Sequence, residues 1–184
     1  GTVVTLQGNF MLGGGASAST VTLADFLASA NRAVGYIGAA GAQLGERALL
    51  CAGGTDFTGV PVPDHVKVVG PVNYTRIFAA SKAIVHHGGS GTTACSLRAG
   101  VPTLILWSSA DQPYWGNQLQ RLKVGASRRF SKTTSESLVA DLREILAPDY
   151  AVRARDLATK MSTPAESITK TADLFEDSVR GRMR

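Results

Sequence analysis

The chain has 184 residues, of which 44% are hydrophobic and 18% are charged, and its formal net charge is +5. This composition is typical of one globular domain with a substantial core, and it excludes a disordered, collagen-like or disulfide-stapled chain. No apolar run reaches the roughly 20 residues of a membrane-spanning helix, and no secretory signal pattern opens the sequence, so we expect a soluble, cytoplasmic protein. Because Gly1 stands where a native start would have Met, we expect an excised piece of a longer protein.

Six short apolar segments have the composition of buried strands. They are residues 2–6, 47–51, 66–69, 83–85, 103–107 and 126–130. Helical patterns alternate with them at residues 23–44, 74–80, 92–99, 114–122, 135–146, 150–161 and 164–179. This alternation predicts a parallel sheet covered on both faces, the doubly wound, Rossmann-like α/β fold. In such sheets ligands bind beyond the carboxyl ends of the strands.

The charges and cysteines restrict the partners. Basic side chains concentrate in the last third, where acidic ones are interleaved at helical spacing, so no nucleic-acid partner is expected. Arg180, Arg182 and Arg184 end the chain as a basic tail, for which an anionic membrane surface is a weakly supported alternative. Cys51 and Cys95 lie among small or apolar residues and are expected to be reduced, buried thiols.

The most informative segment, residues 86–93, joins the end of a predicted strand to the start of a helix. It reads His86-His87-Gly88-Gly89-Ser90-Gly91-Thr92-Thr93. Glycine permits close backbone approach, and the free N–H groups and dipole of the following helix favour an anion. With the hydroxyls and a histidine as further donors, the segment predicts a phosphate-binding turn. On the turn alone, a purely structural connection with a histidine pair is an equal alternative.

Other motifs match this turn poorly. Gly89 to Ala94 fits the degenerate dinucleotide pattern G-x-G-x-x-A, and Asp111 stands near where a ribose-binding acid would be sought. That pattern belongs to the first βα turn of its fold, whereas three predicted strands precede this one. An NAD-type domain is therefore a minor alternative, and the nucleophile-elbow and Walker A patterns both fail.

A second polar segment, residues 110–117, follows the next predicted strand and therefore lies at the same sheet edge. Asp111 and Gln112 are an adjacent carboxylate and carboxamide, which can bind several hydroxyls of one sugar. A helix N-cap at Asp111, with Pro113 in the first turn, is the structural alternative and is compatible with that role. For Trp115, packing and ligand contact are equally favoured.

These motifs resemble the donor-binding signature of family 1 glycosyltransferases. The resemblance rests on IVHHGGSGTT at residues 84–93, LRAGVP at 97–102 and DQPYW at 111–115, in this order and spacing. The segment 70–74 also resembles the loop that packs near the nucleotide base. The likeness is strongest to bacterial enzymes acting on glycopeptides and glycolipids and to sterol glucosyltransferases. The chain as a whole resembles the C-terminal half of the two-domain GT-B architecture, without the N-terminal acceptor-binding half.

The resemblance implies a UDP- or TDP-sugar as donor substrate, no cofactor, no metal, and inverting transfer to a lipid or natural-product hydroxyl. It assigns the donor pyrophosphate to His87, Gly89, Ser90, Gly91 and Thr92, and the donor sugar to Asp111 and Gln112. Further candidate donor contacts are Gly8, Asn9, Val72, Asn73 and Trp115.

No catalytic residue is expected in this chain. Inverting transfer requires a base for the acceptor hydroxyl, which in such enzymes is typically a histidine of the N-terminal half, and His65 is expected to be an exposed loop residue. Cys95 stands where plant relatives carry a glutamate for the ribose. We therefore expect one donor-binding domain over residues 1–184, inactive alone, with a helix and tail over 164–184 that reach the missing half. A separate donor-binding subunit of a split enzyme is the alternative.

Overall fold

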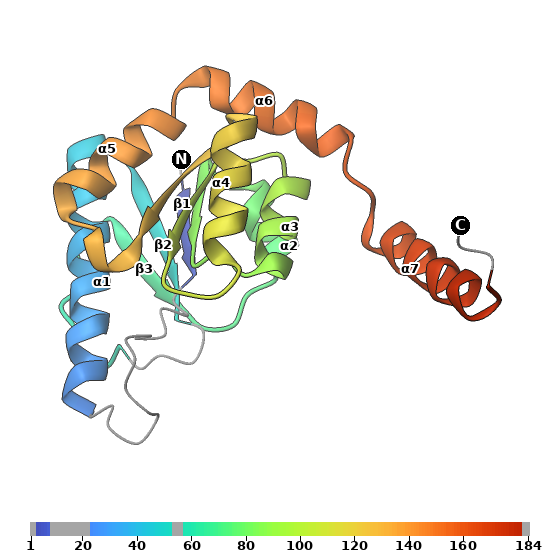
Figure 1. Ribbon diagram of the computed structural model, residues 1–184. Helices are drawn as coiled ribbons and strands as arrows, with labels where there is room; N and C mark the ends of the chain where they lie inside the picture. The colour runs from blue at the N-terminus through green and yellow to red at the C-terminus, as the bar shows by residue number, and fades with distance from the viewer. Residues whose placement is uncertain (1–2, 8–22, 53–56, 182–184) are drawn as a thin grey trace.

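The computed structural model describes residues 3–7, 23–52 and 57–181 of the chain. These residues form a parallel sheet of six strands with helices on both faces (Figure 1). The strands are β1 (Val3–Gln7), β2 (Arg47–Cys51), β3 (Val66–Val69), β4 (Ala83–His86), β5 (Thr103–Trp107) and β6 (Gly125–Arg129). The helices are α1 (Leu23–Leu44), α2 (Tyr74–Ala79), α3 (Ser90–Arg98), α4 (Gln112–Leu122), α5 (Ser135–Ile145), α6 (Pro148–Thr159) and α7 (Pro164–Val179), with a 3₁₀ turn at Phe130–Lys132. The doubly wound parallel α/β prediction is confirmed.

The strand order is β3-β2-β1-β4-β5-β6, and every neighbouring pair is parallel. The order reverses between β1 and β4, which is the switch point where open α/β sheets form a binding crevice beyond their carboxyl ends. His86 ends β4 and residues 87–93 follow it, so this segment lies beside the switch point.

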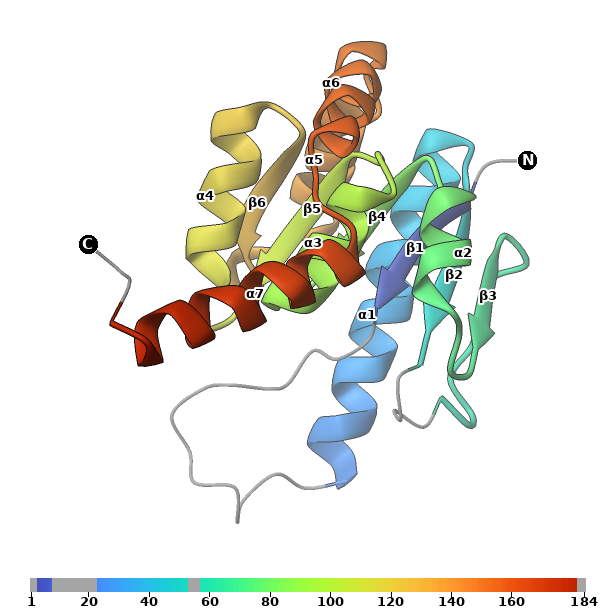
Figure 2. The same ribbon diagram turned by 90° about the vertical axis from the view of Figure 1, so that its right-hand side faces the viewer.

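Two apolar layers cover the sheet because successive strand residues point to opposite faces. Val85 of β4 belongs to the core formed with α1 and α5, whereas Ile84 packs with Phe78 of α2. On that second face Ile105 of β5 packs with Leu119 of α4 and with α6. Figure 2 shows α3 and α4 on this face of the sheet and α1 behind it. The carboxyl edge of the sheet thus lies between two layers of packed helices.

Three helices begin two residues earlier than the sequence predicts, and one of them is α6, which begins at Pro148 rather than at residue 150. α3 begins at Ser90 rather than Thr92, because Gly89 is the N-cap with an extended backbone, and α4 begins at Gln112 rather than Tyr114. Glycine has a low helix propensity, so Ser90-Gly91 reads as loop in the sequence, but tertiary packing overrides that preference. The shift puts the glycine-rich turn directly at a helix N-terminus.

Three further expectations can be compared with the structure. Cys51 is buried and Cys95 half-buried, and both are unpaired. His65 is half-buried rather than exposed, because its Nε2 lies 2.8 Å from the Gly38 carbonyl oxygen of α1. Among the helices within the described ranges, none is long and apolar enough to cross a membrane.

The last helix, α7, projects away from the sheet (Figure 1). A capping box of Thr163 and Glu166 starts it, and the Arg98 side chain of α3 donates to the Ser162 carbonyl at 2.7 Å. Phe175 is 70% exposed, so the predicted apolar side of α7 packs against nothing within the described chain at this residue. Of the predicted basic tail, Arg180 pairs with Glu176 within α7, and Arg182 and Arg184 lie outside the described residues.

Candidate functional site

The two polar segments singled out in the sequence meet at the carboxyl edge of the sheet. β4 and β5 are neighbours, and Gly88 follows the first while Gln112 follows the second. A Cβ at Gly88 would lie 2.7 Å from Ile105 Cγ2 and 3.2 Å from Gln112 Cβ, and the φ of Gly88 is +94°. Only glycine fits this conformation and this close approach. The glycine-rich turn is thus packed directly on the first residue of α4.

The N-terminus of α3 presents unpaired donors. Its first backbone bond is from Thr93 N–H to the Gly89 carbonyl, and no side chain caps it. The N–H groups of Ser90, Gly91 and Thr92 therefore have no partner among the described residues. A Cβ at Gly91 would meet nothing within 4 Å, and no acidic residue lies in the first turn. Free N–H groups, the helix dipole and open space together make an anion-binding position.

The two adjacent histidines have different environments. His86, the last residue of β4, is fully buried, and its Nδ1 accepts the Gly88 N–H at 2.9 Å. Burial, and secondarily His87, lowers the pKa of His86 to about 3, so the ring is neutral and its Nε2 carries the proton. That Nε2 has no hydrogen-bond partner among the described residues. His86 thus acts on the backbone of the turn rather than on a ligand.

His87 is half-buried and lies against the N-cap of α3. A Cβ at Gly89 would lie 2.6 Å from His87 Nε2, so this nitrogen sits directly beside the helix N-terminus. Burial lowers the pKa of His87, and the negative charge of Asp111 partly opposes that shift. Its Nδ1 is buried without a partner in the described part of the chain. An anion at α3 would favour the protonated ring, because nearby negative charge raises the pKa of an imidazole.

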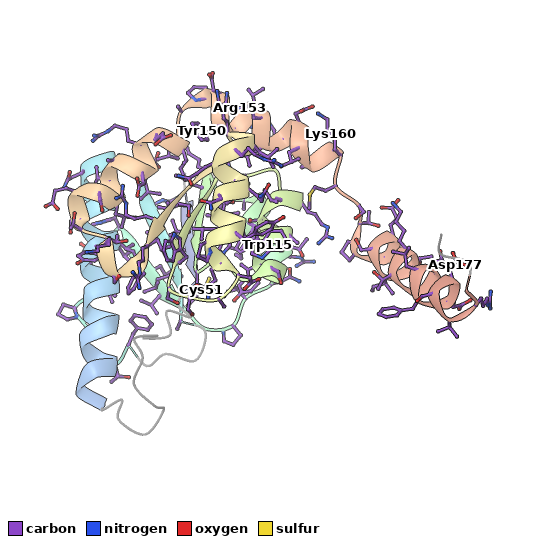
Figure 3. All side chains as sticks on the ribbon, in the orientation of Figure 1. Cys51, Trp115, Tyr150, Arg153, Lys160 and Asp177 are labelled. Atoms are coloured by element: carbon purple, nitrogen blue, oxygen red, sulfur yellow. The ribbon has the colours of Figure 1, made fainter. Side chains whose placement is uncertain are left out.

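The predicted carboxylate and carboxamide stand at the start of α4, Asp111 just before it and Gln112 as its first residue. Gln112 Oε1 accepts the backbone N–H groups of Ser108 at 2.8 Å and Ser109 at 3.2 Å. Asp111 occupies the N-cap position, but its side chain caps nothing; instead its Oδ2 accepts the indole N–H of Trp115 at 2.8 Å. Figure 3 shows Trp115 on α4. The bond to Asp111 was missed in the sequence, although the i, i+4 spacing of the two residues on one helix face could have indicated it.

The other candidate contacts come from two further segments of the chain. Val72 and Asn73 lie in the turn between β3 and α2, where Asn73 Oδ1 accepts the Arg76 N–H and caps α2. Gly8 and Asn9 lie outside the described residues. Among the described residues, no group of three or more His, Cys, Asp or Glu could hold a metal ion.

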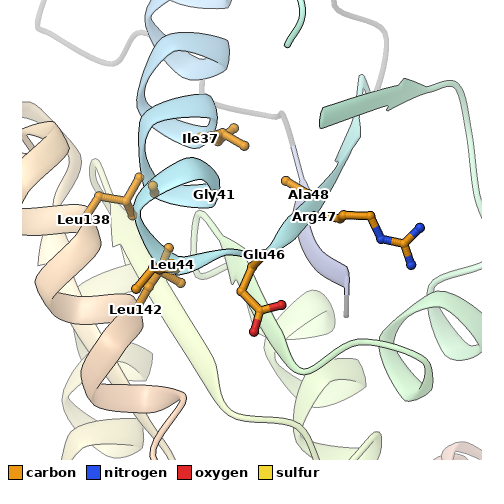
Figure 4. A pocket seen from close by; sticks show the side chains of 9 residues that line it. Ile37, Gly41, Leu44, Glu46, Arg47, Ala48, Leu138 and Leu142 are labelled. Atoms are coloured by element: carbon orange, nitrogen blue, oxygen red, sulfur yellow. The ribbon is translucent and has the colours of Figure 1, made fainter. Parts of the chain in front are cut away.

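A small hollow lies at the opposite edge of the sheet. Figure 4 shows it between the end of α1, α5 and the start of β2. Ile37, Leu44, Ala48, Leu138 and Leu142 contribute apolar side chains to its wall. It lies between two helices and the start of a strand, at the amino edge of the sheet, so it is not part of the site at the carboxyl edge.

The fold and the site define a parallel α/β domain with an anion-binding turn beside its switch point. A family model described as Erythromycin biosynthesis protein CIII-like, C-terminal domain, matches residues 53–174. The chain belongs to this family of glycosyltransferase C-terminal domains.

Relatives and solved structures agree with this assignment. An uncharacterised glycosyltransferase of Mycobacterium tuberculosis is 60% identical over 147 residues, which cover 80% of this chain and 36% of the relative. The vancomycin aglycone glucosyltransferase of Amycolatopsis orientalis is 34% identical over 73% of this chain and 33% of its own length. The crystal structure of the glycosyltransferase VinC in complex with DTDP superposes with a TM-score of 0.70 at 20% identity, covering 95% of this chain and 42% of VinC. The chain thus spans about a third of the curated relatives it matches.

Proposed function

We propose that this chain is the donor-binding domain of a GT-B glycosyltransferase and that it binds a UDP- or TDP-sugar at the carboxyl edge of β4 and β5. The observation that carries the proposal is the packing of Gly88 on Gln112, which brings the uncapped N-terminus of α3 beside a carboxylate and a carboxamide. A nucleotide sugar joins these two chemistries in one molecule, because its diphosphate is an anion and its sugar is a polyol.

Each part of the site has a role in this proposal. The N–H groups of residues 90–92 and the Nε2 of His87 bind the pyrophosphate, and Asp111 and Gln112 bind sugar hydroxyls. When the sugar leaves, negative charge grows on the nucleoside diphosphate, and preorganised donors that face this charge lower the barrier. In this proposal the helix N-terminus and His87 supply that stabilisation without a metal or a cofactor.

The remainder of the reaction is assigned outside this chain. The proposed reaction is inverting transfer to a hydroxyl of a lipid or natural product in the cytoplasm, and it requires a base for that hydroxyl. We place this base and the acceptor pocket in an N-terminal domain. Two findings support this division: the chain covers about a third of its relatives, and one of these relatives is a vancomycin aglycone glucosyltransferase.

The structure disfavours the dinucleotide alternative. In a fold of order 3-2-1-4-5-6 the dinucleotide fingerprint occupies the turn after the first strand, whereas Gly89 to Ala94 follow β4.

Calorimetric titration of the chain with uridine diphosphate and thymidine diphosphate, with NAD as control, tests the proposed function. We expect binding of at least one diphosphate and none of NAD. His87→Ala should weaken diphosphate binding about tenfold, the effect of losing one hydrogen bond to a charged group, and His86→Ala should weaken it less. No binding of either diphosphate, or equal losses for the two variants, would contradict the assignment.

A further inference from the structure

The hydrogen bonds of the loop before α4 give its two polar side chains fixed and opposite orientations. Gln112 Oε1 receives the N–H groups of Ser108 and Ser109, and the Ser108 hydroxyl lies 3.3 Å away. These donors identify the oxygen end of the carboxamide. What remains on Gln112 is its NH₂ group, which can only donate a hydrogen bond.

The free end of Asp111 is a hydrogen-bond acceptor, in contrast to that of Gln112. Its Oδ2 accepts the Trp115 indole N–H at 2.8 Å, and Oδ1 of this exposed side chain has no partner among the residues that the structure describes. The half-buried Trp115 ring packs against the buried cluster of Ile105 and Leu119 and makes an edge contact with Tyr114, at a centroid distance of 5.2 Å and an interplanar angle of 80°. A carboxylate oxygen accepts hydrogen bonds and donates none. The free end of Asp111 is thus an acceptor beside a donor.

The backbone of the loop reinforces this arrangement. Ala110 has a φ of +57°, a conformation that costs a residue with a side chain about 1 kcal/mol or more. Such strain persists only where surrounding contacts over-determine it. Here the contacts are those of Gln112 with Ser108 and Ser109 on one side and of Asp111 with Trp115 on the other.

We propose that Trp115 is a positioning residue that fixes Asp111, so that Asp111 and Gln112 read the hydrogen-bonding polarity of two neighbouring sugar substituents. This rests on the proposed function, since it assumes that the donor sugar lies at this loop. The substituent facing Asp111 must carry a hydrogen to donate, as a hydroxyl or an amine does. The substituent facing Gln112 must accept, so a hydroxyl or a carbonyl oxygen fits there. The site takes a hexose with an intact hydroxyl at the Asp111 position and rejects a deoxy or keto group there.

Two variants of adjacent aromatic residues test the positioning role. Trp115→Phe keeps a ring but loses the indole N–H, whereas Tyr114→Phe is the matched control, because the Tyr114 hydroxyl makes no hydrogen bond to a described residue. Each variant is titrated calorimetrically with uridine diphosphate and with UDP-glucose, or with thymidine diphosphate and TDP-glucose if the chain binds thymidine diphosphate. The difference between the two affinities gives the contribution of the sugar to binding. We expect Trp115→Phe to bind the sugar nucleotide about three- to tenfold more weakly with unchanged diphosphate affinity. Tyr114→Phe should match the wild-type chain on both ligands.

Asp111→Asn tests the polarity itself. With its oxygen on the Trp115 N–H, the new amide turns its NH₂ toward the sugar and becomes a donor. The probes are UDP-glucose molecules in which one hydroxyl at a time is replaced by fluorine, which cannot donate. We expect one of them to bind the wild-type chain about tenfold more weakly than UDP-glucose does, and this loss to shrink in Asp111→Asn.

The outcomes separate the two proposals. A chain that binds neither diphosphate contradicts the proposed function, and this inference with it. Suppose that the diphosphate binds the wild-type chain. The positioning role is then wrong if Trp115→Phe binds the sugar nucleotide as tightly as the wild-type chain does, or if it loses affinity for the diphosphate and for the sugar nucleotide by the same factor. In both cases the donor site stands. A sugar nucleotide that binds no more tightly than its diphosphate, or fluorine losses unchanged in Asp111→Asn, would overturn the assignment of Asp111 as the acceptor.

Discussion

The buried imidazole of His86 makes the stability of this domain depend on pH in a specific way. Its pKa in the folded chain is lowered to about 3 from an ordinary 6.5, mainly by burial. Because the folded pKa is the lower one, the neutral ring stabilises the fold fully above about pH 6.5. This contribution is lost as the pH falls toward the folded pKa, since unfolding then takes up a proton. Between the two pKa values the free energy of unfolding should fall by about 1.4 kcal/mol per pH unit from this residue alone.

Urea unfolding of the wild-type chain and of His86→Asn, followed by tryptophan fluorescence, measures this loss. Asparagine can accept the Gly88 N–H through its Oδ1, but it does not titrate. At pH 7 we expect the variant to be about 1–3 kcal/mol less stable, because the smaller side chain leaves a void. From pH 6 to 4.5 the difference should shrink by about 1.4 kcal/mol per pH unit, since the carboxyl groups and His87 titrate in both chains and cancel.

The comparison has a clear refuting result. If the two free energies of unfolding stay a constant distance apart from pH 7 to 4.5, His86 takes up no proton on unfolding. The ring would then be protonated or solvent-exposed in the folded chain, and the account of the turn built on its neutral Nδ1 would fail.

Three further predictions concern the turn and the far edge of the sheet. Diphosphate affinity should rise as the pH falls from 7.5 to 6, because the lowered pKa of His87 rises beside an anion and binding takes up a proton; calorimetry in buffers of different ionisation enthalpy should show this uptake, and His87→Ala should abolish it. Gly88→Ala should weaken diphosphate binding and lower the free energy of unfolding by about 1–3 kcal/mol, since its methyl would meet Ile105; an unchanged urea midpoint would contradict the close packing. Asp141→Asn should cost about 1–3 kcal/mol by breaking the paired bonds of 2.6 and 2.8 Å from Arg128, and its diphosphate affinity should not change.

The sequence by itself determined the elements and the kind of chemistry. Residues 104–107 of the run TLILW are apolar at four consecutive positions, which is typical of a strand buried on both faces, so the parallel sheet was predictable. The glycines and hydroxyls after β4 predicted an anion-binding turn because their chemistry is local. The same holds for Asp111 and Gln112, whose neighbouring donor and acceptor groups can be recognised without a fold.

The tertiary structure alone decided how these parts are oriented. His86 and His87 are the same residue type at adjacent positions, yet one is fully buried and the other half-buried, since the strand end turns one ring into the core. The contact of Gly88 with Gln112 depends on β4 and β5 being neighbours, and strand order is a property of the whole sheet. The opposite polarity of Asp111 and Gln112 depends on bonds to an indole and two backbone amides that a residue pattern does not orient. Local chemistry can be read from residue types, but direction and proximity arise only when the packed chain brings distant segments together.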